Sequence, residues 1–395
     1  MQILKFQFED KSEGWRLNET SFNDRMTLLV GASGVGKTLI LKALDRMKYV
    51  AEGWSYKGAE WNIEYVPDDG NHHVWRGAFQ NHGLSDINWR QRDTNRSNYS
   101  KIEYEQLEIN GEIVAERDTN GITFNKKPTL KLSPQESILK LFQEEEQIKP
   151  SCEGFEKIDF TDHTNSVHPD IPLFSMNLPQ QMDLDAIRKN RIPLIGKLHL
   201  VKQIEKNIFE TIQDRFISIF PQVRAIKSDI LEPFDNDMPP FYKDCLFIQI
   251  QEQGVDHWIW PNRISSGMYR TLLQLCDLYL CPDGTVFLMD EFENSLGINC
   301  IKEITEDIFT QDRQLQFIVT SHHPYIIGNI PFDNWKIVTR NGGVVKTHSL
   351  ADLGCDFTVS RHDSFMQLMQ LDEFLTGQEQ EDQEQENEHL LLGRR

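Results

Sequence analysis

The residues best suited to chemistry form the stretch GASGVGKT at 31–38, which matches the pattern G-x-x-x-x-G-K-[ST]. Glycines let such a loop curl so that successive backbone N–H groups point at phosphate oxygens, and a helix that starts there adds its positive dipole end. We expect Lys37 to reach the β- and γ-phosphates and the Thr38 hydroxyl to bind magnesium. The predicted ATP-binding residues are Gly31, Ala32, Ser33, Gly34, Val35, Gly36, Lys37 and Thr38.

A second group of reactive side chains ends the apolar stretch TVFLMDE at 285–291. Such a stretch is typical of a buried strand that carries its last residues to the C-terminal edge of a sheet, beside a phosphate-binding loop. Asp290 is predicted to hold the metal there, and Glu291 to polarise an attacking water. A glutamate directly after the metal-binding aspartate favours ATP hydrolysis over phosphate transfer to a small molecule.

A third strand-like stretch, LQFIVT, is followed by Ser321, His322 and His323. One predicted helix separates it from TVFLMDE, so we expect its end to lie alongside the phosphate-binding loop. His322 is the nearer histidine to the strand end and the preferred candidate to donate a hydrogen bond to the γ-phosphate. Neighbouring side chains on a strand point to opposite faces, which argues against a metal site made of both histidines. The predicted catalytic residues are Lys37, Glu291 and His322.

The stretch RISSGMYR at 263–270 places two serines and a glycine at the start of an apolar helix. Taken alone, it is an ordinary N-cap. Together with the phosphate-binding loop, VFLMDEFENSLG and VTSHHP, in this order, it resembles the ABC-type ATPase heads of the SMC, RecF and OLD-like group over about residues 1–350. In that family this turn is the signature motif, which caps the γ-phosphate held by a second subunit. The resemblance implies that Ser265 or Ser266 offers a hydroxyl, and Gly267 a close backbone approach, to ATP bound by the partner of a head-to-tail dimer.

The same resemblance implies two further sites. The stretch ENSLG corresponds to the loop that crosses the dimer interface, with Asn294 and Ser295 as its contact residues. Phe292 and Gly297 stand where relatives often carry proline and histidine, so this loop is expected to pack differently. For the glutamine that senses magnesium in the family, the candidate is Gln80, after the strand-like HHVWRGAF.

Hydrophobic patterning predicts the elements that must position these residues. Strands are expected at 2–8, 26–30, 285–290, 315–320 and 335–339, and helices at 267–280 and 298–309. Strand-like pieces at 61–66, 72–79 and 105–118, separated by turn signals at 68–71 and 110–111, predict a small antiparallel meander. Further expectations are a helix capped by Ser133, a helical stretch over 183–218 broken at Pro193, and a hairpin over 244–260.

The resemblance and these elements predict an α/β fold, a P-loop ABC-type ATPase head with a mixed sheet, an antiparallel β-subdomain and a helical lobe. Five parts are expected: an N-terminal ATPase lobe over 1–130, a helical lobe over 131–260, a C-terminal ATPase lobe over 261–350, a helical segment over 351–378 and an acidic disordered tail over 379–395. The segment 351–378 is expected to pack on its own head or on a partner. Too few residues follow 350 for the Toprim nuclease domain of some relatives.

Composition restricts the choice of partners. With 61 acidic and 41 basic residues, the net charge of −20 disfavours unaided binding to nucleic acid or an anionic membrane, although a local basic groove remains open. No apolar run approaches the ~18 residues of a membrane span, and the N-terminus lacks the plan of a signal peptide, so a cytoplasmic protein is expected. The six cysteines include no C-x-x-C pair and are read as reduced.

These patterns favour a magnesium-dependent ATPase, and the resemblance implies that it forms a dimer around two ATP molecules, or a higher homo-oligomer. By resemblance, it would act as sensor or regulator of a separate effector protein, such as a nuclease, in bacterial anti-phage defence. A RecF-type DNA-repair ATPase is the alternative, and it would require salt-sensitive DNA binding. The subunit of a membrane transporter is disfavoured by the Ser-Ser-Gly-Met signature and by the lack of a clear glutamine loop.

Overall fold

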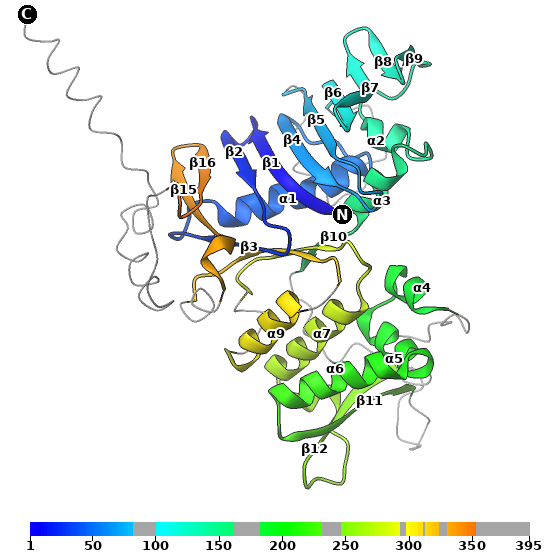
Figure 1. The fold of residues 1–395 in the computed structure, drawn as a ribbon, viewed down its shortest axis with the longest axis vertical. Coiled ribbons are helices and arrows are strands. Elements are labelled where there is room, and N and C mark those ends of the chain that lie inside the picture. Colours follow the sequence, from blue (N-terminus) through cyan, green and yellow to red (C-terminus); the bar gives the residue numbers. More distant parts are fainter. Residues whose placement is uncertain are drawn as a thin grey trace, which may run out of the picture. The chain divides into compact units, whose positions relative to one another are not determined.

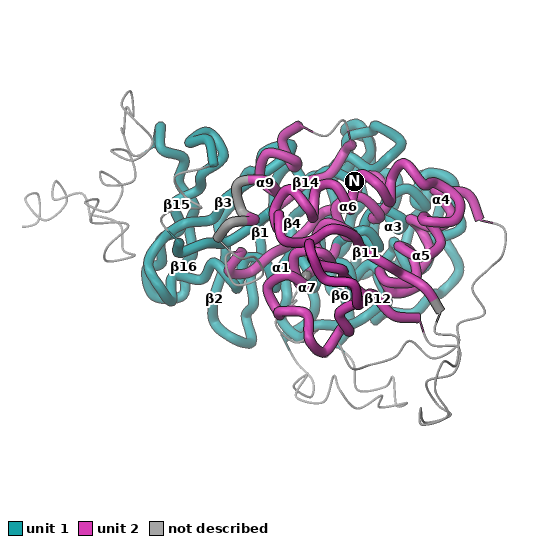
Figure 2. Tube along the Cα trace, turned by 90° about the horizontal axis from the view of Figure 1, so that it is seen from below, with its two compact units in different colours: residues 1–158, 318–395 teal, residues 159–317 magenta. Residues whose placement is uncertain are grey.

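The computed structural model describes residues 1–81, 100–161, 182–230, 246–292, 298–310, 313–323 and 330–352. The chain divides into two units, unit 1 with residues 1–158 and 318–395, and unit 2 with residues 159–317 (Figure 2). Residues 353–395, which include the acidic tail and all but the first two residues of the predicted helical segment, lie outside the described residues. Asn294 and Ser295 also lie outside them.

Unit 1 contains a large mixed sheet with the strand order β3-β15-β16-β2-β1-β4-β5-β6-β7-β8-β9. Its strands are β1 (Gln2–Asp10), β2 (Trp15–Ser21), β3 (Met26–Val30), β4 (Ala59–Val66), β5 (His73–Phe79), β6 (Ile102–Ile109), β7 (Glu112–Asp118), β8 (Gly121–Phe124), β9 (Lys127–Pro128), β15 (Trp335–Asn341) and β16 (Val344–His348). Strands β3 and β15 pair in parallel, as do β16 and β2. The pairs from β2 through β1 to β9 are antiparallel.

The antiparallel part is the predicted meander, and its sequence explains it. Side chains of β4 alternate between buried and half-buried positions along the whole strand, with Trp61, Ile63 and Tyr65 in the core. The turn between β6 and β7 is formed by Asn110 and Gly111, both at positive φ (51° and 81°), as a two-residue hairpin with right-handed twist requires. The predicted meander is therefore confirmed.

The helices of unit 1 are α1 (Lys37–Ala51), α2 (Ile138–Leu141) and α3 (Lys149–Glu156), with a short 3-10 helix, η4 (Phe332–Asn334). The buried side chains of α1 include Ile40, Leu41, Leu44 and Met47, at the spacing of one helical face. The prediction of a helix capped by Ser133 is wrong. The helix begins later, and Ser137 caps it by accepting a hydrogen bond from the Lys140 N–H at 3.2 Å.

Unit 2 is mainly helical (Figure 1), with α4 (Leu184–Lys189), α5 (Leu194–Ile204), α6 (Lys206–Ile219), α7 (Ser266–Leu280), α9 (Ile298–Thr310) and the 3-10 helix η3 (Pro261–Arg263). Its strands are β10 (Ile158–Thr161), β11 (Val223–Ile230), β12 (Leu246–Glu252), β13 (Val286–Met289) and the start of β14 (Gln316–Thr320). The helical stretch predicted over 183–218 is broken at Pro193, as expected, and again at Glu205, where α5 ends. None of the described helices is long and apolar enough to cross a bilayer.

The hairpin predicted over 244–260 is present only as a single antiparallel bridge, and the main partner of its first strand lies elsewhere in the sequence. Strand β12 pairs antiparallel with β11, in a register that sets Ile230 opposite Leu246, while Ile250 and Ile259 form an isolated bridge. Strand β11 was not predicted from the sequence, because its buried residues alternate with Arg224, Lys227 and Asp229 on a polar face. A two-stranded ribbon with one polar face gives a weaker apolar signal than a buried strand.

Candidate functional site

The phosphate-binding loop of unit 1 lies between a buried strand and a helix. All five residues of β3 are buried, the chain leaves the sheet at Gly31, and α1 begins at Lys37. The Lys37 ammonium donates to the carbonyl oxygens of Gly31 at 2.9 Å and Ala32 at 2.8 Å, and its side chain is only 5% exposed. The loop therefore already folds around a buried positive charge, as a site for polyphosphate requires.

Two glycines of this loop are fixed by close packing and backbone angle. A Cβ on Gly31 (φ +151°) would lie 2.5 Å from the Val338 carbonyl oxygen of β15. A Cβ on Gly36 (φ +104°) would lie 3.0 Å from the Val345 side chain of β16. Gly36 is also the N-cap of α1 and supplies no side-chain hydrogen bond to the first turn. A helix N-terminus, with its positive dipole end, therefore lies directly beside the loop.

The residues at this loop fit ATP with magnesium. Ser33 and Gly34 are exposed at the tip of the loop, where phosphate would approach, and Thr38 is half-buried in the first turn of α1. Among the residues that the structure describes, no cluster of three or more His, Cys, Asp or Glu side chains is preformed for a metal ion. The Thr38 hydroxyl and phosphate oxygens are donors that suit magnesium, which keeps part of its water shell and needs few protein ligands.

In unit 2, β13 carries the two predicted carboxylates at its end. The four strand residues are all buried, Asp290 is half-buried, and Glu291 is exposed. Glu291 adopts φ +50°, a left-handed conformation that costs a glutamate on the order of 1–3 kcal/mol, and the next residue, Phe292, is 1% exposed. The chain thus turns sharply between the strand and a buried anchor, which leaves the Glu291 carboxylate at the surface.

The serine–glycine turn, also in unit 2, starts α7. Ser265 is the N-cap, and its hydroxyl oxygen accepts a hydrogen bond from the Met268 N–H at 3.2 Å. Ser265 and Ser266 are exposed, and a Cβ added to Gly267 would meet no atom within 4 Å. Both hydroxyls and an open stretch of backbone therefore face outwards at the N-terminus of a buried helix.

A comparison with protein families decides the identity of the chain. The family described as "AAA domain, putative AbiEii toxin, Type IV TA system" matches residues 26–328. This span starts at β3 and includes the phosphate-binding loop, the serine–glycine turn, both carboxylates and His322. The chain belongs to this AAA domain family. No curated protein matches it.

Solved structures show the fold of this AAA domain protein. An SMC head bound to the C-terminal winged-helix domain of ScpA is 15% identical, with a TM-score of 0.52, over 89% of this chain and 98% of that chain. A second SMC head with an extended coiled coil, bound to the C-terminal domain of ScpA derived from Pyrococcus furiosus, is 15% identical over 93% and 99%, with a TM-score of 0.49. The fold rests on the first likeness. The predicted α/β head of the SMC and ABC type is confirmed.

The sequence offers three further candidates in the AAA domain, His322, His323 and Gln80. His322 is exposed and His323 half-buried, and the His323 N–H donates to the buried Ser321 hydroxyl at 3.0 Å. Gln80 follows β5, with its backbone bonded to Gly58 and Lys101. The roles of His322 and Gln80, like those of Asn294 and Ser295, stay predictions.

The predicted residues are divided between the two units. The loop over 31–38 and His322 belong to unit 1, whereas 265–267, Asp290 and Glu291 belong to unit 2. Sequence reasoning missed the left-handed backbone at Glu291, because no pattern of residue types announces it. It also missed three cations that bind the far end of α7, since single basic residues scattered over more than a hundred positions form no motif.

Proposed function

We propose that this AAA domain protein binds ATP with magnesium and hydrolyses it in a head-to-tail dimer of two copies. The observation that carries the proposal is the phosphate-binding loop, in which a buried Lys37 ammonium donates to the Gly31 and Ala32 carbonyl oxygens where α1 begins. A surface turn has no reason to bury a lysine ammonium within its own backbone.

In this proposal the residues divide the work as follows. The N–H groups of 31–38 and the Lys37 ammonium bind the phosphates, while Thr38 and Asp290 hold magnesium, which supplies positive charge next to them. Glu291 accepts the proton of a water molecule as that water attacks the γ-phosphorus, and His322 donates a hydrogen bond to the γ-phosphate. The second copy contributes Ser265 or Ser266 and the open backbone at Gly267. The exposed positions of Ser265 and Ser266, and the open space next to the half-buried Gly267, support this role.

We further propose that ATP-driven dimerisation is the signal that this protein delivers to a separate effector. The description of its family names a putative toxin of a type IV toxin–antitoxin system. We propose bacterial defence against phage as the setting, in line with the resemblance of the sequence motifs. A nuclease is the effector class that we favour. The cytoplasm is the expected location.

Two variants test the proposal. Lys37→Ala removes the charge inside the loop and should weaken ATP binding by at least about tenfold, a loss of roughly 1.4 kcal/mol. Glu291→Gln removes the base without removing a phosphate contact, so it should bind ATP normally and accumulate as an ATP-bound dimer. Size-exclusion chromatography with light scattering measures this dimer. A Glu291→Gln protein that binds ATP and stays a monomer at all concentrations would contradict the dimer.

A further inference from the structure

The C-terminal end of α7 is held by cations. The last carbonyls of a helix have no partner inside it, and many helices solve this with a glycine just past the end. Here the residue after the helix is Cys281, in an extended conformation, with its N–H donating to the Asp277 carbonyl at 3.0 Å. The next three carbonyls, those of Leu278, Tyr279 and Leu280, accept from Arg313, Arg188 and Lys197.

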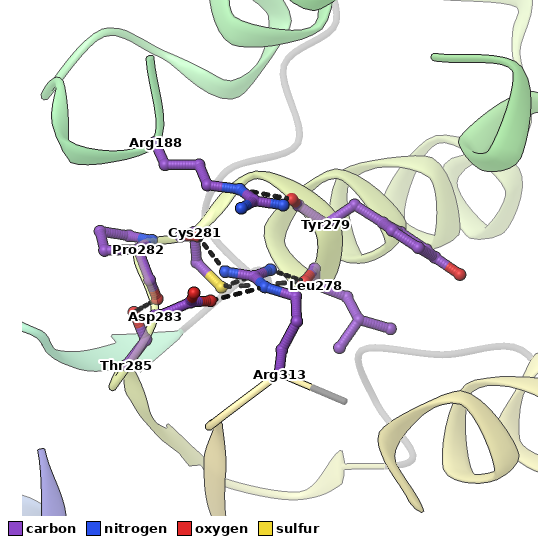
Figure 3. A network of polar contacts seen from close by, with 8 residues as sticks. All are labelled: Arg188, Leu278, Tyr279, Cys281, Pro282, Asp283, Thr285 and Arg313. Atoms are coloured by element: carbon purple, nitrogen blue, oxygen red, sulfur yellow. Dashed lines mark hydrogen bonds and ion pairs between the residues drawn. The ribbon is translucent and has the colours of Figure 1, made fainter. Parts of the chain in front are cut away.

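Arg313 makes the largest set of contacts in this cluster (Figure 3). Its guanidinium donates to the Leu278 carbonyl at 2.6 Å and to the Cys281 carbonyl, and its Nε donates to the Asp283 carboxylate at 2.8 Å. The Cys281 sulfur lies 3.5 Å from the same guanidinium. The Arg313 side chain is 14% exposed. Arg313 therefore binds both the end of α7 and the turn that leads into β13.

The other two cations bind the end of α7 and not that turn. Arg188 donates its Nε–H to the Tyr279 carbonyl at 3.3 Å. Lys197 donates to the Leu280 carbonyl at 3.4 Å and to the Arg188 carbonyl at 2.6 Å. In Figure 3 the Arg188 side chain points at Tyr279, and no dashed line joins it to Asp283 or Arg313. Arg188 thus supplies a positive charge to the same helix end without a hydrogen bond to the start of β13.

Backbone hydrogen bonds hold Arg313 at the start of two strands. The Gly284 N–H donates to the Gln314 carbonyl at 2.8 Å, and the Gln316 N–H donates to the Thr285 carbonyl at 3.1 Å. Strand β13 starts one residue after Thr285, and β14 starts three residues after Arg313. The backbone next to Arg313 is therefore bonded to the start of β13, and the guanidinium of the same residue is bonded to the end of α7.

Both elements that Arg313 joins are stiff. Eleven residues of α7 are buried, and the helix of 15 residues is about 22 Å long at 1.5 Å per residue. Strand β13 is buried throughout. The N-terminus of α7 carries the serine–glycine turn, and the C-terminus of β13 carries Asp290 and Glu291. A shift where Arg313 joins the two elements is transmitted along both, because close-packed interiors deform little.

We propose that Arg313 is a positioning residue for ATP hydrolysis, which fixes the serine–glycine turn of α7 relative to Glu291, two residues after β13. This inference rests on the proposed function. It assigns Arg313 no contact with ATP, since its donors are occupied by Leu278, Cys281 and Asp283. Loss of Arg313 should thus leave ATP binding at the phosphate loop intact and impair the steps that need α7 and β13 together.

The test compares Arg313→Gln and Arg313→Lys with Arg188→Gln in the full chain. Both glutamine variants remove one cation from the same helix end, so their effects on α7 stability should be similar. Only the Arg313 variants release the start of β13. In the Arg313 variants we expect kcat to fall by about tenfold to a hundredfold, which is the order of the loss that a 1 Å misplacement of reacting groups causes. Their KM for ATP should stay within about twofold of wild type. Arg188→Gln should keep nearly full kcat.

Arg313→Lys separates charge from geometry. Lysine retains the positive charge at the helix end, but its compact ammonium cannot reproduce the planar fork on three acceptors. Its melting temperature should therefore stay close to that of wild type while kcat falls. If Arg313→Gln does not fold, the comparison of Arg313→Lys with Arg188→Gln serves alone. Combined with Glu291→Gln, the Arg313 variant should also form less ATP-trapped dimer.

Three results would overturn the inference. One is equal kcat in the folded Arg313 and Arg188 variants, and another is a fall in kcat that follows the loss of folded protein. The third is a matching loss of ATP affinity in the Arg313 variants. Each leaves the proposed function standing, because wild type still hydrolyses ATP. A wild-type protein without ATPase activity overturns the proposed function first, and the role of Arg313 with it.

Discussion

At the scale of single residues, Gly31 and Gly267 differ in the space around them. Gly31 is closely packed, whereas a side chain at Gly267 would meet no atom within 4 Å. Gly31→Ala would push a methyl group to 2.5 Å from the Val338 carbonyl at a positive φ. We expect it to lower the free energy of unfolding by roughly 1–3 kcal/mol and to weaken ATP binding. Chemical denaturation and nucleotide titration measure both.

Gly267→Ala is the matched control, because its methyl group would enter open space at a helix start. Its stability should be unchanged or higher by up to about 1 kcal/mol, since alanine favours a helix. Its ATP-driven dimerisation should fail, because the methyl group blocks close approach of the partner's phosphate. Normal dimerisation of Gly267→Ala would argue against the role of this glycine.

Glu105 predicts a pH dependence of stability. Burial raises its pKa to about 7, although Arg117 nearby and hydrogen bonds from the Ile138 N–H and the Trp75 indole, both at 2.9 Å, favour the charged form. Between pH about 4.5 and 7 the folded protein then binds more protons than the unfolded chain, so its free energy of unfolding falls as pH rises. The fall contributed by this group is roughly 3 kcal/mol at 1.36 kcal/mol per pKa unit.

Urea denaturation between pH 5 and 7.5 measures that fall. Glu105→Gln cannot ionise, so its stability should depend less on pH over this range than that of wild type, whatever its absolute value. Parallel pH profiles for the two proteins would show that Glu105 is charged in the folded state at pH 5.

At the scale of elements, the two serines at the start of α7 have different structural roles. Ser265 caps the helix, whereas Ser266 is an exposed residue of its first turn. Ser265→Ala removes the N-cap hydrogen bond to Met268 and should destabilise the protein by about 1 kcal/mol. Ser266→Ala changes an exposed hydroxyl in the first turn and should alter stability by less than about 0.5 kcal/mol. Thermal unfolding of both variants measures this difference, and ATP-driven dimerisation then shows which hydroxyl the partner's nucleotide needs.

Elements with a strong periodic signal could be predicted from the sequence, and those defined by distant partners could not. The strands 26–30 and 315–320 and the helix 267–280 were predicted to within one residue, because buried runs between turn residues leave few alternatives. Strand β11 was missed and the helix start at Ser133 was wrong, because pairing with β12 and capping by Ser137 depend on tertiary context.

The candidate site shows the same division. Spacing alone predicts the residues of the phosphate-binding loop, since glycine, lysine and threonine are required there by the chemistry of phosphate. Spacing cannot predict that Glu291 has φ +50°, nor that Arg313 binds the opposite end of the signature helix. These features arise when segments far apart in the chain meet, so no local pattern contains them.

At the scale of the whole molecule, the proposed function needs a second copy of the chain. In the proposal, the serine–glycine turn of one copy acts on the ATP held by the phosphate-binding loop of the other. If the turn serves the partner's nucleotide, one copy can carry a damaged loop and the other copy a damaged turn. Each variant alone has two damaged sites, whereas a mixed dimer has one intact site.

Mixing Lys37→Ala with Ser266→Arg measures this directly. The first variant lacks the charge of the loop and retains the turn, and the second retains the loop and carries a bulky cation at an exposed position of the turn. A head-to-tail dimer predicts that each variant alone hydrolyses almost no ATP and that their equimolar mixture recovers a substantial part of wild-type activity. If both variants fold and their mixture is no more active than either one alone, the two copies do not share their sites.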